Sequence, residues 1–300
     1  MMMRKAVLLL SLMVLLISLS GCTSQNVQLG KPEIRGVSYS FGNITDDYTE
    51  IETFIDVYNP NPVAIPLKDV KTEIYMNRIK MGEGSAEKSE IAANSLSKII
   101  LSTKIENEKI PEWWASHLKN GERTEMLIKA NLIFDLKLFE FSYPMEKSEI
   151  IQTNLLSKFS IWSPQKIEVG PLSLTLKSMS ASWGEITNES SELILRARIQ
   201  NENQFDVRFR FEGNLTMNGI EVAKGGSEEQ IVLPAQRESE VEMRIRINNM
   251  LLDDWWSTHI RNGERTNLSL MLNLIFEYGG KEYRFNVKAM TSELRTSFIG

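Results

Sequence analysis

The 300-residue chain has a single cysteine, Cys22, and only two histidines. One cysteine excludes an intramolecular disulfide, so the domains must be stable through their hydrophobic cores alone. One histidine in each half of the chain, His117 and His259, with no free cysteine beside it, falls short of the three or four ligands that a zinc site needs. The chain also lacks a Gly-x-Ser-x-Gly nucleophile elbow and a phosphate-binding glycine loop. The sequence therefore predicts no catalytic residue, no metal and no cofactor.

The chain also lacks an excess of positive charge, since 34 Lys and Arg stand against 39 Asp and Glu. The formal net charge is −5, and no lysine and arginine cluster is long enough to follow a phosphate backbone. This argues against nucleic-acid binding. The hydrophobic content of 42% and the charged content of 24% are typical of a folded globular chain. A length of 300 residues favours two domains.

The N-terminus has the parts of an export signal. Arg4 and Lys5 precede an apolar run over residues 6–19, and small residues follow up to Cys22. The ending Leu-Ser-Gly-Cys resembles a lipobox, in which the cysteine becomes the lipidated first residue of the mature chain. We expect a signal peptide over residues 1–21, lipidation of Cys22 and a polar tether over residues 22–30. The protein would then be held at the membrane and face outside the cytoplasm. An uncleaved signal anchor with an incidental cysteine is the alternative.

One segment occurs twice. Residues 111–124 contain Trp113-Trp114, His117 and the run Asn-Gly-Glu-Arg-Thr, and residues 253–266 repeat this pattern. The offset is 255 − 113 = 142 residues, which indicates a tandem duplication of whole domains rather than short stacked repeats. We place the first domain at residues 31–158, a linker at 159–166 and the second domain at 167–300.

Most of each copy alternates between apolar and polar residues, which is typical of half-buried strands. Residues 48–58, 97–105 and 239–247 are examples, and the glycines of residues 82–85 suggest a break. Around Trp113 the apolar residues instead follow helical spacing, with Pro111 suited to the first turn and Gly121 to a left-handed end. The predicted fold is all-β: two tandem antiparallel β-sandwiches of about seven short strands, each with one short helix.

A turn motif follows the second predicted strand. Asn59-Pro60-Asn61-Pro62 combines two X-Pro steps with two asparagines that can hydrogen-bond nearby backbone. The second copy keeps Asn201 and Asn203 but lacks both prolines. We therefore expect the asparagines to build the turn and the prolines to add rigidity.

This Asn-Pro-Asn step, the Pro66-Leu67 pair after it and the later helix that leads into a long strand resemble the WHy (water stress and hypersensitive response) domain. That family is also known as the folded, type 2 late embryogenesis abundant proteins. The resemblance covers most of residues 31–158 and, through the repeat, 167–300. It implies a fibronectin type III-like sandwich and a role in stress or desiccation tolerance.

The repeated helix is the candidate contact surface. Trp113, Trp114 and His117, with Trp255, Trp256 and His259 in the copy, either close the sandwich or leave an exposed patch. Adjacent tryptophans on a helix point about 100° apart, so we expect a one-helix domain to leave one partly exposed. Such a patch could bind a protein, a glycan or a membrane surface. The Glu122-Arg123 and Glu264-Arg265 pairs are interpreted as solvated, salt-bridged strand entries.

The favoured hypothesis is a non-enzymatic, lipid-anchored, extracytoplasmic protein that protects proteins or membranes by surface contacts. The alternative is a binding or adapter module of a cell-envelope assembly that recognises a protein or a glycan. An enzyme is the least favoured hypothesis.

Overall fold

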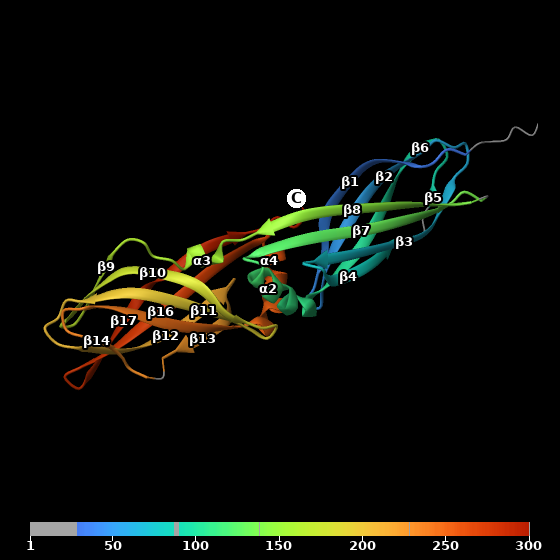
Figure 1. Ribbon diagram of the computed structural model, residues 1–300. Helices are drawn as coiled ribbons and strands as arrows, with labels where there is room; N and C mark the ends of the chain where they lie inside the picture. The colour runs from blue at the N-terminus through green and yellow to red at the C-terminus, as the bar shows by residue number, and fades with distance from the viewer. Residues whose placement is uncertain (1–28, 87–89, 138, 228, 300) are drawn as a thin grey trace, which may run out of the picture.

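Two β-domains stand end to end in the computed structural model, which describes residues 29–86, 90–137, 139–227 and 229–299 (Figure 1). The predicted signal peptide and Cys22 lie outside these residues. Within the part of the chain that is described, no helix is long and apolar enough to cross a membrane.

The first domain is one antiparallel sheet folded over on itself. Its strands pair in the order β1-β2-β6-β4-β3-β7-β8, and the short β5 pairs with β3. The elements are β1 (Glu33–Ile44), β2 (Tyr48–Asn59), β3 (Ile65–Met76), β4 (Ile79–Ala86), β5 (Glu90–Ile91), β6 (Ser95–Glu106), the 3-10 turn η1 (Asn107–Lys109), α2 (Ile110–Lys119), β7 (Arg123–Asp135) and β8 (Glu140–Gln152).

The second domain repeats this order with one added strand at the edge. The order is β17-β16-β12-β13-β15-β11-β10-β9, and β14 pairs with β12. The short helix α3 (Leu155–Lys158) comes before it, and the elements are β9 (Gln165–Val169), β10 (Leu172–Ile186), β11 (Ser190–Asn201), β12 (Val207–Met217), β13 (Ile220–Gly226), β14 (Ile231–Leu233), β15 (Glu238–Asn248), η2 (Asn249–Leu251), α4 (Leu252–Arg261), β16 (Arg265–Tyr278) and β17 (Lys281–Arg295).

The predicted fold class is confirmed: both domains are antiparallel sandwiches with few short helices. Alternation determines which faces form the core, because successive strand side chains point to opposite sides of a sheet. In β2 every second residue is buried, including Ile51, Ile55 and Val57, as the period-two pattern predicts. The strands are long rather than short, since most of them extend over 11 to 15 residues.

The glycines of residues 82–85 do not break the chain as predicted. They lie inside β4, where β4 pairs antiparallel with β6. A Cβ atom on Gly82 would lie 1.7 Å from the carbonyl oxygen of Lys104. The two backbones approach too closely for a side chain, and this explains glycine within a strand.

The predicted helices and turns are present. Pro111 lies in the first turn of α2, and the chain leaves the helix through Gly121 at φ +72°, as Gly263 does after α4 at φ +67°. Asn218 and Gly219, which connect β12 and β13, have φ values of 51° and 85°, and an Asn-Gly pair favours such a two-residue hairpin turn because both positions need positive φ.

Candidate functional site

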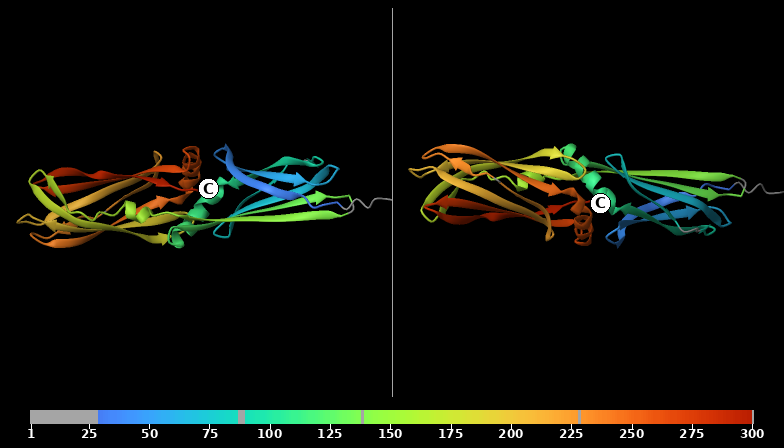
Figure 2. Two further views of the ribbon diagram at one scale, coloured as in Figure 1. Left: turned by 90° about the horizontal axis from the view of Figure 1, so that it is seen from above. Right: turned by 90° about the horizontal axis from the view of Figure 1, so that it is seen from below.

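The prediction that one tryptophan of each pair stays partly exposed is wrong. Trp113, Trp114, Trp255 and Trp256 are exposed by 3%, 2%, 2% and 0%, respectively. A single sandwich with one helix offers too little surface to cover both rings. The missing cover comes from the other domain, because α2 and α4 lie side by side between the two sandwiches (Figure 2).

The four tryptophans interlock in a pseudosymmetric arrangement. Trp113 packs edge-on against Trp256 with ring centroids 5.4 Å apart, and Trp114 packs against Trp255 at the same 5.4 Å. Phe298, near the end of the chain, lies 4.9 Å from Trp256 and 5.8 Å from Trp113. Edge-to-face geometry is favoured by the ring quadrupoles and adds to the burial of apolar area. The repeated helix is therefore the contact between the domains.

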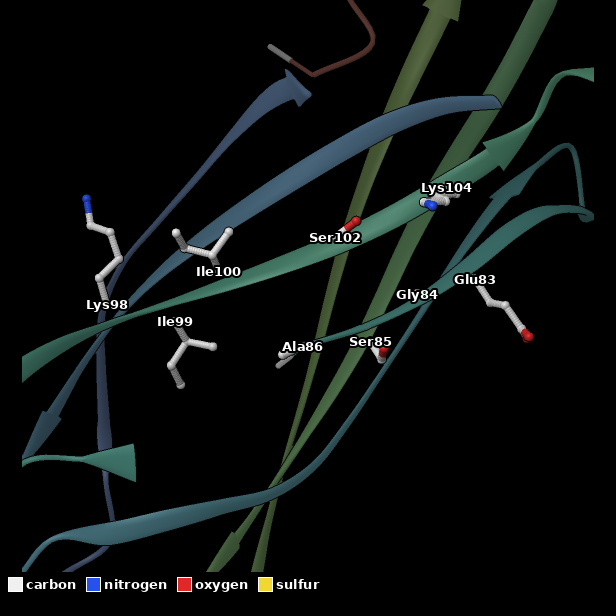
Figure 3. Close-up of a pocket in the computed structure, with 9 residues that line it drawn as sticks. All are labelled: Glu83, Gly84, Ser85, Ala86, Lys98, Ile99, Ile100, Ser102 and Lys104. Carbon is white, nitrogen blue, oxygen red and sulfur yellow. The ribbon is translucent and has the colours of Figure 1, made fainter. Parts of the chain in front are cut away.

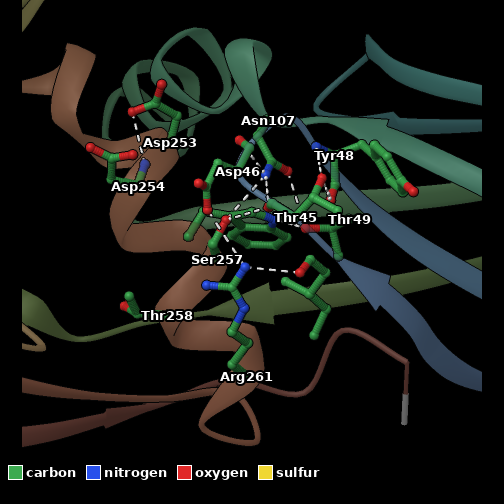
Figure 4. A network of polar contacts seen from close by, with 12 residues as sticks. Thr45, Asp46, Tyr48, Thr49, Asn107, Asp253, Asp254, Ser257, Thr258 and Arg261 are labelled. Atoms are coloured by element: carbon green, nitrogen blue, oxygen red, sulfur yellow. Dashed lines mark hydrogen bonds and ion pairs between the residues drawn. The ribbon is translucent and has the colours of Figure 1, made fainter.

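Polar contacts fasten α4 to the end of the first domain (Figure 4). The indole Nε1 of Trp256 donates to Thr49 Oγ1 at 2.9 Å. Ser257 Oγ donates to the carbonyl oxygen of Thr45 at 2.8 Å and accepts from Asn107 Nδ2 at 3.2 Å. These groups are buried or half-buried, so each contact satisfies a donor or acceptor that water does not reach.

Arg261 completes this contact at the edge. Its guanidinium donates to the carbonyl oxygen of Ile44 at 2.8 Å and lies 3.5 Å from the carboxylate of Asp46. Both side chains are well exposed, so the ion pair contributes less than the carbonyl bond.

The repeat is not symmetric in these contacts. The positions equivalent to Thr49 and Ser257 are Ser191 (49 + 142) and Ala115 (257 − 142). Ala115 has no hydroxyl group to repeat the Ser257 contacts. Trp114 Nε1 is the one buried side-chain polar atom without a hydrogen-bond partner among the described residues. The half of the interface that α4 forms is thus the more strongly hydrogen-bonded.

Both histidines are buried and bonded to hydroxyl groups. His117 Nδ1 lies 2.8 Å from Thr124 Oγ1, and His117 Nε2 lies 2.8 Å from Thr153 Oγ1. His259 makes the same pair of contacts with Thr266 and Thr296. Burial lowers the pKa of each imidazole from its ordinary 6.5 to about 4. No group of three or more His, Cys, Asp or Glu suited to a metal ion occurs in the described part of the chain. The histidines connect α2 and α4 to the strands around them.

These histidines make the protein less stable in mild acid. The unfolded chain takes up a proton on each histidine below about pH 6.5, whereas the folded chain does so only near pH 4. Stability is therefore complete above pH 6.5 and falls as the pH decreases towards 4. We expect a loss of about 2 kcal/mol per histidine by pH 5.

Urea unfolding at pH 7.5 and pH 5.0 measures this loss. His259→Gln retains a donor and an acceptor but has no titratable ring, so it should remove about half of the difference. An equal difference in wild type and variant would contradict the assignment.

Glu122 was interpreted as solvated, and that interpretation is wrong. The residue is 5% exposed, and it accepts from Leu155 N at 2.5 Å and from Leu156 N at 3.1 Å. It also accepts from the indole of Trp183 in the second domain at 3.2 Å. No nearby sequence signal predicts these partners, which are 33, 34 and 61 positions further along the chain. Glu122 is a second polar link between the domains.

The Asn-Pro-Asn motif is the turn that the sequence predicts. Asn59 Nδ2 donates to the carbonyl oxygens of Val63, Ile91 and Ala92, while its Oδ1 accepts from Asn61. Asn201 and Asn203 repeat these contacts in the second domain without any proline. The asparagines therefore build the turn, as expected.

A groove lies on the first domain where β4 meets β6 (Figure 3). Its volume is about 750 Å³, and its lining includes Glu83, Ser85, Lys98, Ile100, Ser102 and Lys104. Lys104 lies 4.3 Å from the ring of Tyr48 and has a cation-π partner. The groove is open, and in its lining the Ser102 hydroxyl donates to the carboxylate of Glu50.

One protein family and several individual proteins are similar to this chain. The late embryogenesis abundant protein family, LEA_2, matches residues 54–149 and 196–289. The uncharacterised protein MJ1138 of Methanocaldococcus jannaschii is 24% identical over 159 residues, which are 52% of this chain and 86% of that protein. A crystal structure of a protein from Archaeoglobus fulgidus is 27% identical with a TM-score of 0.40, and covers 41% of this chain and 98% of that one. The solution structure of AT1g01470 from Arabidopsis thaliana is 15% identical with a TM-score of 0.32, and covers 42% of this chain and 83% of that one. Since the matched residues make up more than half of the chain and fall in both halves, the chain belongs to the late embryogenesis abundant protein family, with one matched region in each domain.

Proposed function

We propose that this protein is a non-catalytic, lipid-anchored, extracytoplasmic protein that protects other proteins or membranes under stress or desiccation. Membership of the late embryogenesis abundant protein family supports the link to stress, and the family is generally non-enzymatic. The lipobox-like ending at Cys22 supports the anchor. The burial of both histidines between threonines supports a role without catalysis.

One observation carries the proposal: the end-to-end contact extends the molecule away from the end of the first domain that carries Gly30. The described chain enters the first domain at Gly30, whose N–H donates to Asn61 Oδ1 at 2.6 Å. Asn61 lies just beyond the end of β2, whereas Tyr48 at the other end of β2 lies near α4 (Figures 1 and 4). A strand of 12 residues at about 3.3 Å each spans about 40 Å. An anchor at Cys22 would thus hold one domain near the membrane and extend the other outwards.

The adapter hypothesis now needs a different surface, because the tryptophan helices are already occupied. Trp162, between α3 and β9, is 76% exposed and is the most exposed large apolar side chain among the described residues. Exposed tryptophan is enriched in binding hot spots. Trp162 is the specific observation that favours a protein or glycan partner as the second candidate.

Mixing the purified protein with heat-stressed or dried client enzymes separates the two functions. Protection predicts that several unrelated clients keep their activity and stay in solution, and that Trp162→Ala retains most of this effect. The adapter predicts unprotected clients and recovery of one stoichiometric partner, which Trp162→Ala abolishes. Protection that is absent for every client would refute the protective role.

A further inference from the structure

We propose that the end of the first domain farthest from the second domain docks directly on the lipid bilayer, by inserting the side chains of Val63, Leu96 and Phe139. This end is called the proximal tip. It consists of the loops of residues 59–67 and 91–97 and of Phe139. The proposal rests on the lipid anchor at Cys22 that is part of the proposed function.

Three exposed apolar side chains lie on the segments that form the proximal tip. Val63, Leu96 and Phe139 are exposed by 41%, 58% and 50%, respectively. Val63 follows the end of β2, Leu96 lies at the start of β6 opposite Tyr58, and Phe139 precedes β8. Scattered exposed apolar residues are ordinary, but a group of them at one end of a domain marks a contact surface.

Hydrogen bonds hold the first two loops together. Asn59 Nδ2 donates to the carbonyl oxygens of Ile91 and Ala92 at 3.1 Å and 3.2 Å, and Asn94 N donates to the carbonyl oxygen of Asn61 at 2.8 Å. Val63 and Leu96 therefore lie on two loops that hydrogen bonds hold in a fixed arrangement. Little conformational entropy would be lost when these loops bind.

The two loops carry no charge, unlike their equivalents in the second domain. Residues 59–67 and 91–97 contain no Asp, Glu, Lys or Arg. At the offset of 142, residues 201–209 and 233–239 contain Glu202, Asp206, Arg208, Arg237 and Glu238. Leu96 itself corresponds to Glu238 (96 + 142). Since the fold tolerates charge at these positions, its absence from the proximal tip is not required by folding.

The anchor places this tip, and not the other one, at the bilayer. Gly30 lies eight positions after Cys22, and eight extended positions span at most about 28 Å. Gly30 is bonded to Asn61 in both directions, through its N–H at 2.6 Å and its carbonyl oxygen at 2.8 Å. A lipid on Cys22 would therefore hold the loop of residues 59–67 close to the bilayer surface, where a weak apolar contact becomes effective.

The charged residues around the tip sum to zero, so docking should not require anionic lipids. Five basic residues are balanced by five acidic ones: Lys31, Arg35, Lys68, Lys98 and Lys137 against Glu33, Asp69, Glu90, Asp135 and Glu140. With no excess of positive charge, docking depends on apolar insertion rather than on attraction to anionic headgroups. Vesicles of phosphatidylcholine should suffice, and added salt should have little effect.

A fluorescent reporter on the full anchored chain tests the proposal. Leu96→Cys would carry an environment-sensitive dye, because lipidation consumes the sulfur of Cys22, and the matched control is Glu238→Cys. In phosphatidylcholine vesicles we expect the dye at position 96 to shift to shorter wavelength and to lie about 5–10 Å deep, measured by quenching with brominated lipids. The dye at position 238 should stay quenchable by aqueous iodide. Val63→Asp in the Leu96→Cys protein should return that dye towards water.

The outcomes separate the docking from the anchor. If the protein sediments with vesicles but position 96 is as accessible to iodide as position 238, the docking proposal fails and the anchor stands. If wild type and Cys22→Ser incorporate no radiolabelled lipid and both stay in the supernatant, the anchor fails and the docking proposal falls with it.

Discussion

Replacement of Trp256 by alanine is expected to destabilise the protein by about 3–5 kcal/mol, as for other buried aromatic residues, and to separate the unfolding of the two domains. Trp256 is fully buried, packs against Trp113 and Phe298, and donates to Thr49 of the first domain. Its removal leaves a cavity at the contact between the domains and deprives Thr49 Oγ1 of its indole donor, while the bond from Thr49 to Asn107 remains. Calorimetry should show one transition in the wild type and two in the variant.

Two controls make this prediction specific. Trp162→Ala removes an exposed ring and should change stability by no more than about 0.5 kcal/mol. Trp114→Ala removes a ring whose Nε1 has no partner, so it should cost less than Trp256→Ala although both are buried. Two domains that still unfold together after Trp256→Ala would show that other contacts, such as Glu122 with Trp183, are enough to couple them.

The sequence predicts the sandwiches well for two reasons. The alternation of apolar and polar residues is a local pattern, and the duplicated segments recur at a constant offset of 142 residues. The strand faces of β2 and the ends of α2 and α4 follow from residue spacing and from the left-handed Gly121 and Gly263. Both copies also constrain each other, so Asn59 and Asn201 could be recognised as the constant part of one turn.

The contact between the domains could not be predicted, because it joins residues far apart in the chain. Trp256 bonds to a threonine 207 positions away, and no periodicity reports such a pair. The sequence did show that adjacent tryptophans are hard to bury on a one-helix domain. An isolated domain would leave one ring exposed, whereas in the protein the other domain provides the cover. The burial of Glu122 has the same cause, since its donors come from α3 and from Trp183.

Asn59→Asp is expected to cost about 3–5 kcal/mol at neutral pH, the range for a buried charge without a partner. The side chain is fully buried, and its Nδ2 donates to three carbonyl oxygens. A carboxylate has the same shape but would place an oxygen against those three acceptors. Because the neutral carboxylic acid suffers less repulsion, the cost relative to wild type should decrease as the pH falls. Urea unfolding at two pH values measures both effects.

The proline beside it provides the matched control. Pro60→Ala keeps all the asparagine contacts and should cost no more than about 1 kcal/mol, the usual effect of a loop proline on the unfolded chain. The second domain supports this expectation, because Glu202 occupies the equivalent position and Asn201 still makes its three bonds. If Pro60→Ala were as costly as Asn59→Asp, the rigidity of the prolines and not the asparagine amide would hold the turn. The proximal tip would then depend on its prolines for its shape. The equivalent loops of the second domain lack these prolines as well as being charged, so comparing the two domains would no longer show that folding tolerates charge at the proximal tip.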